Sequence, residues 1–351
     1  MNRKQRRTAA KVARKQGGAD APANAADLVV EKAIAAAQQG ALAEAEAALD
    51  EVLARFPGHI EALHQKGVLL ARTHRVEAGI EMLRRVTTGQ PREALYWNNL
   101  AAACLTIDRS EEARGAARKA ADLDPRYAMA WRNLALASGD LGQHREAAEA
   151  LEKASTLAPN QADIWNSLGL ARLELRDSAR AEAAFRKAVA LDPGSAECLS
   201  NLGVLLAKGG RAAEALPHLE KAVAIEPDRF TAALHYGIAA ALAGDRNKGL
   251  RWLRRATSIQ PRSDVAWGAL ADAAIAAGER AEALDAARRA AEFAPAEPAH
   301  RVRLQTLQSD CAPMRSTLVE LELDDAPRPR ERDKPDAAGD VSQSLDQVFI
   351  R

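Results

Sequence analysis

Apolar residues recur at helical spacing along most of the chain, and the whole pattern repeats every 34 residues. Within each period, two stretches of roughly a dozen residues place apolar side chains three and four positions apart, the spacing of one face of an α-helix. Because proline disfavours helical geometry in the residue before it, a proline in each period predicts where the second helix ends. These eight lattice prolines are Pro57, Pro91, Pro125, Pro159, Pro193, Pro227, Pro261 and Pro295. A fixed period of this length indicates a stack of helical hairpins.

Small and large residues keep fixed places within the period. In most first helices a large residue is followed by leucine three positions later and then by glycine or alanine; the first, second and seventh repeats depart, with Lys32, Lys66 and Tyr236 in the leucine place. The large residue is tryptophan at Trp97, Trp131, Trp165 and Trp267. Their common place predicts a structural role for all four. The turn carries glycine, which takes left-handed backbone angles easily, at Gly40, Gly142, Gly210, Gly244 and Gly278.

This order of residues resembles the tetratricopeptide repeat. Residues 162–195 match it most closely, through Trp165, Leu168, Gly169, Ala181, Phe185, Ala188 and Pro193. The resemblance implies an all-α fold, a right-handed superhelical solenoid of helix-turn-helix repeats whose first helices line a concave groove. It also implies a protein-binding role without catalysis.

Four segments are predicted along the chain. They are a basic disordered arm at residues 1–25, eight repeats at residues 26–297, a C-terminal capping helix region at residues 298–323, and a disordered tail at residues 324–351 with a short apolar motif at its end. The end repeats depart from the pattern, as Val29, Leu63 and Arg301 show in the place of tryptophan. Atypical end repeats are expected, because they close the core of a stacked array.

The net charge of +1 hides a strongly basic N-terminus. Residues 1–17 contain seven lysines and arginines and no acidic residue, which leaves the rest of the chain acidic overall. This arm is a solvated tail, or it binds RNA or an anionic membrane. It also resembles the MNRKQRR-type openings of bacterial repeat proteins, some of which continue into glycosyl- or sulfotransferase domains. A nucleic-acid or membrane partner is not favoured by the balanced charge of the whole chain.

The sequence predicts no active site, cofactor or metal. Cys104, Cys198 and Cys311 are too few and too widely spaced for a disulfide framework or a metal knuckle, and the seven histidines form no ligand motif. No apolar h-region follows the basic N-terminus, and no apolar run has the length of a membrane span. We therefore expect a non-enzymatic protein in the cytoplasm.

A polar column is the candidate binding site. Two residues after each tryptophan place stand Asn99, Asn133, Ser167 and Asn201, with Asn98, Arg132, Asn166 and His235 beside or in line with them. The column is similar to the asparagines in the repeat array of the O-linked N-acetylglucosamine transferase, which contact a peptide backbone. An amide both donates and accepts, so it pairs with any peptide unit. The alternative is that these amides bond to one another across neighbouring hairpins.

One further tryptophan lies outside the common place. Trp252 stands on a predicted second helix, where it is either an exposed anchor for a partner or a partly buried packing residue.

The predicted function is a scaffold that binds an extended peptide or partner protein in the groove. One alternative is a targeting or regulatory subunit of a separate glycosyl- or sulfotransferase-type enzyme, and another is RNA or membrane association through the arm. The partner, the pathway and the oligomeric state do not follow from the sequence.

Overall fold

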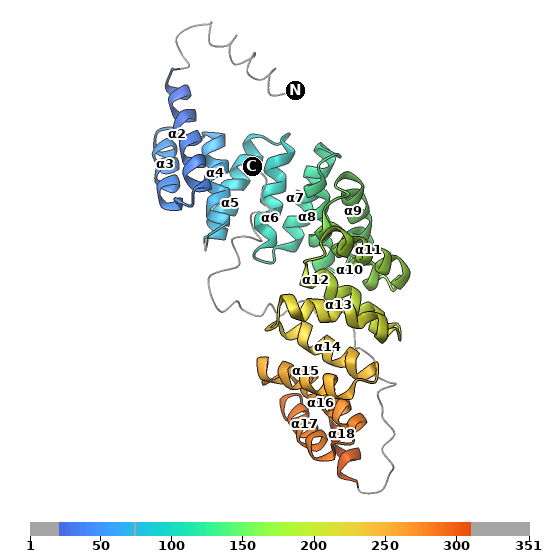
Figure 1. The fold of residues 1–351 in the computed structure, drawn as a ribbon. Coiled ribbons are helices and arrows are strands. Elements are labelled where there is room, and N and C mark those ends of the chain that lie inside the picture. The colour runs from blue at the N-terminus through green and yellow to red at the C-terminus, as the bar shows by residue number, and fades with distance from the viewer. Residues whose placement is uncertain (1–20, 74, 310–351) are drawn as a thin grey trace. The chain divides into compact units, whose positions relative to one another are not determined.

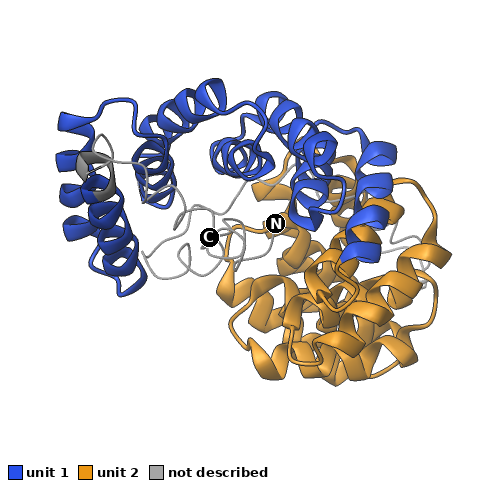
Figure 2. Ribbon diagram, turned by 90° about the horizontal axis from the view of Figure 1, so that it is seen from above, with its two compact units in different colours: residues 1–157, 332–351 blue, residues 158–331 orange. Residues whose placement is uncertain are grey.

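The computed structural model describes residues 21–73 and 75–309, and within these ranges the secondary structure consists of 17 helices and no strand. The chain divides into two compact units, residues 1–157 with 332–351 and residues 158–331 (Figure 2). The predicted basic arm up to residue 20, the C-terminal motif and the rest of the predicted tail lie outside the described residues. The prediction of an all-α stack of hairpins is confirmed.

The described part of unit 1 contains four helical hairpins (Figure 1). Each first helix packs against the helix that follows it in the chain. The helices are α2 (Ala21–Gln38), α3 (Leu42–Arg55), α4 (Ile60–Ala71), α5 (Val76–Gly89), α6 (Ala94–Leu105), α7 (Ser110–Leu123), α8 (Ala128–Asp140) and α9 (His144–Leu157). α2 begins five residues before the predicted start of the repeats, so residues 21–25 are helical where the arm was expected to continue.

Unit 2 contains four further hairpins and a final single helix (Figure 1). The helices are α10 (Ala162–Glu174), α11 (Ser178–Leu191), α12 (Ala196–Lys208), α13 (Ala212–Ile225), α14 (Phe230–Leu242), α15 (Arg246–Ile259), α16 (Asp264–Ala277), α17 (Arg280–Phe293) and α18 (Pro298–Gln308). α18 packs on α17. Its buried residues include His300 and Leu307, while Arg301 in the tryptophan place is exposed.

The lattice prolines mark the helix ends as predicted. Every second helix from α3 to α17 ends two residues before a lattice proline, and the next first helix begins three residues after it. At the turn inside the hairpins, the five predicted glycines have φ between 71° and 90°. Asp108 and Arg176 occupy the same place with φ of 58°, although side chains disfavour this region.

In several hairpins the core depends on a small residue opposite a large one. A Cβ atom on Gly169 would lie 2.5 Å from the Phe185 ring, so only glycine leaves room for that ring. Glycine faces a leucine in the same way in the pairs Gly67–Leu83, Gly203–Leu219 and Gly237–Leu253. Close packing of this kind explains the paired places of small and large residues along the sequence.

The four tryptophans of the common place are structural, as predicted. Each is partly buried, and each indole Nε1–H donates a hydrogen bond of 2.8 to 3.0 Å to the carbonyl oxygen of the lattice proline six residues earlier. The tryptophans therefore tie each hairpin to the proline turn before it. Trp252 is partly buried too, and its ring packs edge-on against Tyr236 with centroids 5.5 Å apart. It is a packing residue and not an exposed anchor.

Candidate functional site

In unit 1 the predicted polar column forms a buried chain of hydrogen bonds. Asn133 Nδ2 donates to Asn98 Oδ1 at 2.9 Å, and Asn98 Nδ2 donates to Asn99 Oδ1 at 3.4 Å. Asn99 Nδ2 lies 2.8 Å from His64 Nε2. The three asparagines have no exposed surface, and His64 is 2% exposed. We call these four residues the amide ladder.

The hydrogen bonds of the amide ladder all run in one direction, from Asn133 toward His64. An amide nitrogen can only donate, so His64 Nε2 accepts from Asn99. The other ring nitrogen, Nδ1, lies 3.7 Å from Glu61 Oε1, beyond hydrogen-bond distance, and is buried without a hydrogen-bond partner among the described residues. The nearby His64 ring is the main cause that lowers the pKa of Glu61 below its usual value. The Tyr96 ring covers His64 with centroids 4.8 Å apart. The ladder thus runs through three first helices, α8, α6 and α4.

In unit 2 a shorter version of the same arrangement appears. Asn201 Nδ2 donates to Asn166 Oδ1 at 2.9 Å, and Asn166 Nδ2 donates to Glu197 Oε1 at 3.1 Å. Asn166 is buried, whereas Asn201 and Ser167 are partly exposed. The column therefore keeps some accessible polar surface in unit 2.

The bonded pairs are 35 residues apart, one period plus one residue. This offset holds for Asn99 with His64, Asn133 with Asn98, and Asn201 with Asn166. The sequence identified these asparagines but not which of them pair. Comparing positions 34 residues apart matches each residue with its equivalent in the next repeat, whereas the bonded partners are 35 residues apart. Asn98 and Asn166, which were placed beside the column, accept two of these bonds, and His64, which the sequence did not single out, accepts the third.

The remaining predicted site residues are less regular. Arg132 is partly buried in α8. His235 in α14 keeps some exposed surface, although its Nδ1 atom is buried and has no hydrogen-bond partner among the described residues. Burial of the ring lowers the pKa of His235 to about 4, with a smaller effect from Lys208. The imidazole is therefore neutral at neutral pH.

An apolar stripe lies beside the column and was missed in the sequence. It stands three residues after the column place, on the same face of each first helix, because residues three apart share a helix face. Its members are Val68, Ala102 and Leu136 in unit 1 and Leu170, Val204 and Ile238 in unit 2. Val68, Leu136, Leu170 and Val204 are partly exposed. These apolar residues recur every 34 positions and so could have been found in the sequence. Apolar residues at helical spacing, however, are normally interpreted as buried core residues.

The described residues contain no cluster of three or more side chains suited to hold a metal ion. Among the described helices, none combines the length and the apolar character needed to cross a membrane. Cys104 and Cys198 are buried free thiols, and burial raises the pKa of Cys104 to about 12. A thiol with so high a pKa is a poor nucleophile at neutral pH.

Comparison with known families agrees with this geometry. Two family models described as tetratricopeptide repeat match the chain, one at residues 132–196 and the other at residues 36–104 and 172–234. The chain is a tetratricopeptide-repeat protein. The family expected from the repeated residues is therefore confirmed. No curated protein matches the sequence.

Solved structures of tetratricopeptide-repeat proteins share the fold. The Cut9–Hcn1 heterotetramer of the APC/C aligns with a TM-score of 0.57 and 17% identity, over 81% of this chain and 56% of that one. This chain thus spans little more than half the length of that relative. PilF of Pseudomonas aeruginosa aligns with a TM-score of 0.53 and 22% identity over 59% and 94% of the two chains. A tetratricopeptide repeat protein from Parabacteroides merdae aligns with a TM-score of 0.54 and 14% identity, over 70% of this chain and 98% of that one.

Proposed function

We propose that this tetratricopeptide-repeat protein is a non-enzymatic scaffold that binds an extended segment of a partner protein along its first helices. The observation that carries the proposal is the apolar stripe, whose partly exposed side chains stand beside polar groups at a fixed spacing. An extended peptide presents apolar side chains and backbone amides in regular alternation, and such a face matches both.

Within the proposal, the column residues have two roles that differ by exposure. Ser167 and Asn201 are partly exposed and bind the peptide backbone, with His235 further along the same face. Asn98, Asn99 and Asn133 are buried, so they hold the first helices in register. Asn166 does the same for Asn201, and the partly buried Arg132 stands next to Asn133 in α8.

The stripe and the polar groups are tested separately. A partner peptide is first identified by affinity capture and mass spectrometry, and its affinity is then measured by fluorescence anisotropy. We expect Leu170→Asp with Val204→Asp to abolish binding, and Ser167→Ala with Asn201→Ala to weaken it. Ala213→Asp is the matched control, because Ala213 is exposed on a second helix. Unchanged affinity in the stripe variant, with helical content preserved in far-UV circular dichroism, would exclude the first-helix face.

The other functions predicted from the sequence stay predictions. Association with RNA or anionic membranes depends on residues 1–17, which lie outside the described residues. A separate transferase partner depends on a resemblance of the same arm. The cytoplasmic location also stays a prediction from the sequence.

A further inference from the structure

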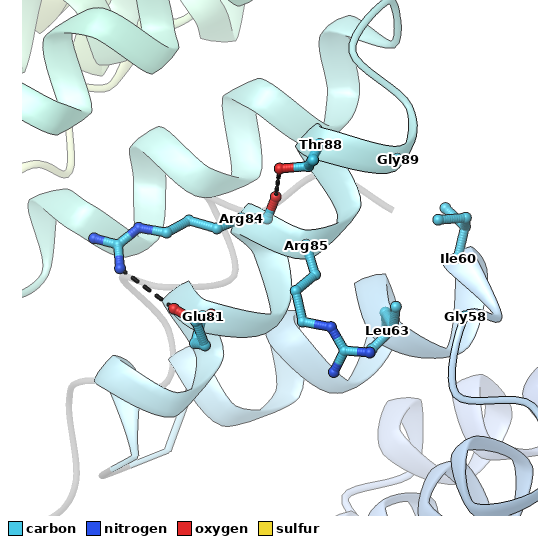
Figure 3. Close-up of a pocket in the computed structure, with 8 residues that line it drawn as sticks. All are labelled: Gly58, Ile60, Leu63, Glu81, Arg84, Arg85, Thr88 and Gly89. Atoms are coloured by element: carbon cyan, nitrogen blue, oxygen red, sulfur yellow. Dashed lines mark hydrogen bonds and ion pairs between the residues drawn. The ribbon is translucent and has the colours of Figure 1, made fainter.

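The second hairpin of unit 1 has an open pocket on its surface. The pocket has a volume of about 440 Å³ and lies between the start of α4 and the end of α5. We call it the indole slot and define it by Gly58, Ile60, Leu63, Arg85 and Gly89. In Figure 3, Arg85 extends from α5 toward Leu63 on α4, while Arg84 points away and pairs with Glu81.

Two positions that carry larger side chains in the next two hairpins of unit 1 carry smaller ones here. Leu63 stands where α6 and α8 carry Trp97 and Trp131. Gly89 stands where α7 and α9 end on leucine, at Leu123 and Leu157. Part of the space is taken by Ile60, whose Cδ1 atom lies 2.8 Å from the position of a Cβ on Gly89. The slot therefore lies at the place that an indole takes in the next two hairpins, and Gly89 adds no side chain to it.

The polar partners of the missing indole are present. In the hairpin of α8 and α9, the Trp131 Nε1–H donates to the Pro125 carbonyl at 3.0 Å, and Lys153 Nζ lies 4.0 Å from the centre of the ring. The equivalent residues of the slot are Pro57 and Arg85. With no indole between them, Arg85 Nη2 donates directly to the Pro57 carbonyl at 2.8 Å.

Arg85 is available for a ligand. It is exposed, and in the described part of the chain its contacts are the Pro57 carbonyl and the Met82 sulfur, with no carboxylate. A guanidinium without an acidic partner binds well over the face of an aromatic ring. A carbonyl oxygen has two lone pairs, so the Pro57 oxygen can accept an indole N–H as well.

We propose that the indole slot binds a tryptophan side chain presented by a partner protein. The ring lies on Leu63 and Ile60 with the guanidinium of Arg85 over its face, and its N–H donates to the Pro57 carbonyl. The bound tryptophan thus repeats the arrangement that the chain makes with its own Trp131. This surface shares no residue with the amide ladder or the apolar stripe, so it adds a second contact to the proposed scaffold.

The experiment uses the full chain with labelled isoleucine and leucine methyl groups, titrated with N-acetyl-tryptophan amide and followed by NMR. We expect saturable shifts of the Ile60 and Leu63 methyl signals with a dissociation constant on the order of 1 mM, a fragment-sized affinity. N-acetyl-leucine amide, the matched control, is expected to bind at least several-fold more weakly, because it lacks the ring and the N–H. Arg85→Ala should weaken tryptophan-amide binding about two- to five-fold.

Filling the slot from within provides the decisive variants. Leu63→Trp supplies the ring that Trp131 supplies in its own hairpin, so we expect a higher melting temperature and no binding of tryptophan amide. Gly89→Leu fills the slot from α5 and serves if Leu63→Trp does not fold. Equal binding of the two amides, or tryptophan-amide binding that survives in a folded filled variant, would overturn the proposal.

Discussion

The amide ladder predicts that removing the acceptor of one hydrogen bond costs more stability than removing its donor. Asn98→Ala removes both the acceptor of Asn133 Nδ2 and the donor to Asn99 Oδ1, and so leaves two buried polar atoms unpaired. Asn133→Ala leaves only Asn98 Oδ1 unpaired, and it also removes Asn133 Oδ1, a buried oxygen without a partner among the described residues.

The structure gives the size of the difference. An unpaired buried polar group costs about 1–3 kcal/mol. The bond to Asn99 is long at 3.4 Å, so its loss falls in the lower part of that range. We expect Asn98→Ala to lower the free energy of unfolding by about 2–4 kcal/mol and Asn133→Ala by about 0–2 kcal/mol. The two variants lose the same side-chain atoms, so lost packing alone predicts no such gap.

The free energy of unfolding of both variants is measured by urea unfolding, followed by far-UV circular dichroism. Repeat arrays can unfold in stages, so the variants are compared only where the slope of the free energy against urea concentration is the same. Asn201→Ala is the control, since the partly exposed Asn201 should cost about 1 kcal/mol or less. Equal losses for Asn98→Ala and Asn133→Ala would refute the ladder as a chain of dependent bonds.

Three further predictions test the packing and the buried histidine. Gly169→Ala should cost about 1–3 kcal/mol because its Cβ meets the Phe185 ring, whereas Gly115→Ala meets no atom within 4 Å and should stabilise by about 0.5–1 kcal/mol; effects of the same sign in thermal unfolding would contradict this. Pro217→Ala inside α13 restores a backbone donor and should stabilise by up to about 3 kcal/mol, and an unchanged melting temperature would count against it. The pKa of His235 is lowered to about 4, so the unfolded state takes up its proton first. The free energy of unfolding should therefore fall by at most about 3 kcal/mol as pH drops from about 6.5 toward 4. His235→Asn should remove this pH dependence from urea unfolding, and an unchanged pH profile in that variant would disprove the prediction.

The helix pattern was predictable because its causes are local. A proline stops a helix through its own ring, so Pro57 and its equivalents predicted the ends of the second helices from chain position alone. The paired places of Gly169 and Phe185 were visible for a similar reason, since a large residue needs a small one opposite it. The positive φ of Asp108 and Arg176 was not visible, because neither residue type marks a left-handed turn as glycine does.

The polar column shows where sequence reasoning stops. Whether Asn99 faces a ligand or a neighbouring helix depends on how closely successive first helices pack, and no single residue encodes that distance. The structure brings Asn99 to His64 and buries both. In unit 2 the same chemistry leaves Asn201 partly exposed. Exposure, and not residue type, therefore separates the register-holding members of the column from those that remain available to a partner.

The same offset of 35 residues accounts for an ion pair made by α18, the last described helix of unit 2. Arg303 of α18 stands one period plus one residue after Gly268, which has no side chain to receive it. The guanidinium reaches instead to Asp272, with contacts of 2.6 and 2.8 Å, and also donates to His300 Nδ1. Asp272 occupies the place of the apolar stripe, so the ion pair closes the stripe at this end.

α18 also differs from the earlier first helices at the close-packed place of the repeat. Every earlier first helix has glycine or alanine where the second helix of its hairpin comes closest, but α18 has the exposed Gln305. The Gln305 side chain is larger than the glycine or alanine that lets Phe185 and its equivalents come close. Near the end of the described part of unit 2 the repeat pattern thus changes at two places, with the charged Asp272 in the stripe and the large polar Gln305 in the close-packed place. Polar substitutions of this kind are typical of a terminal repeat.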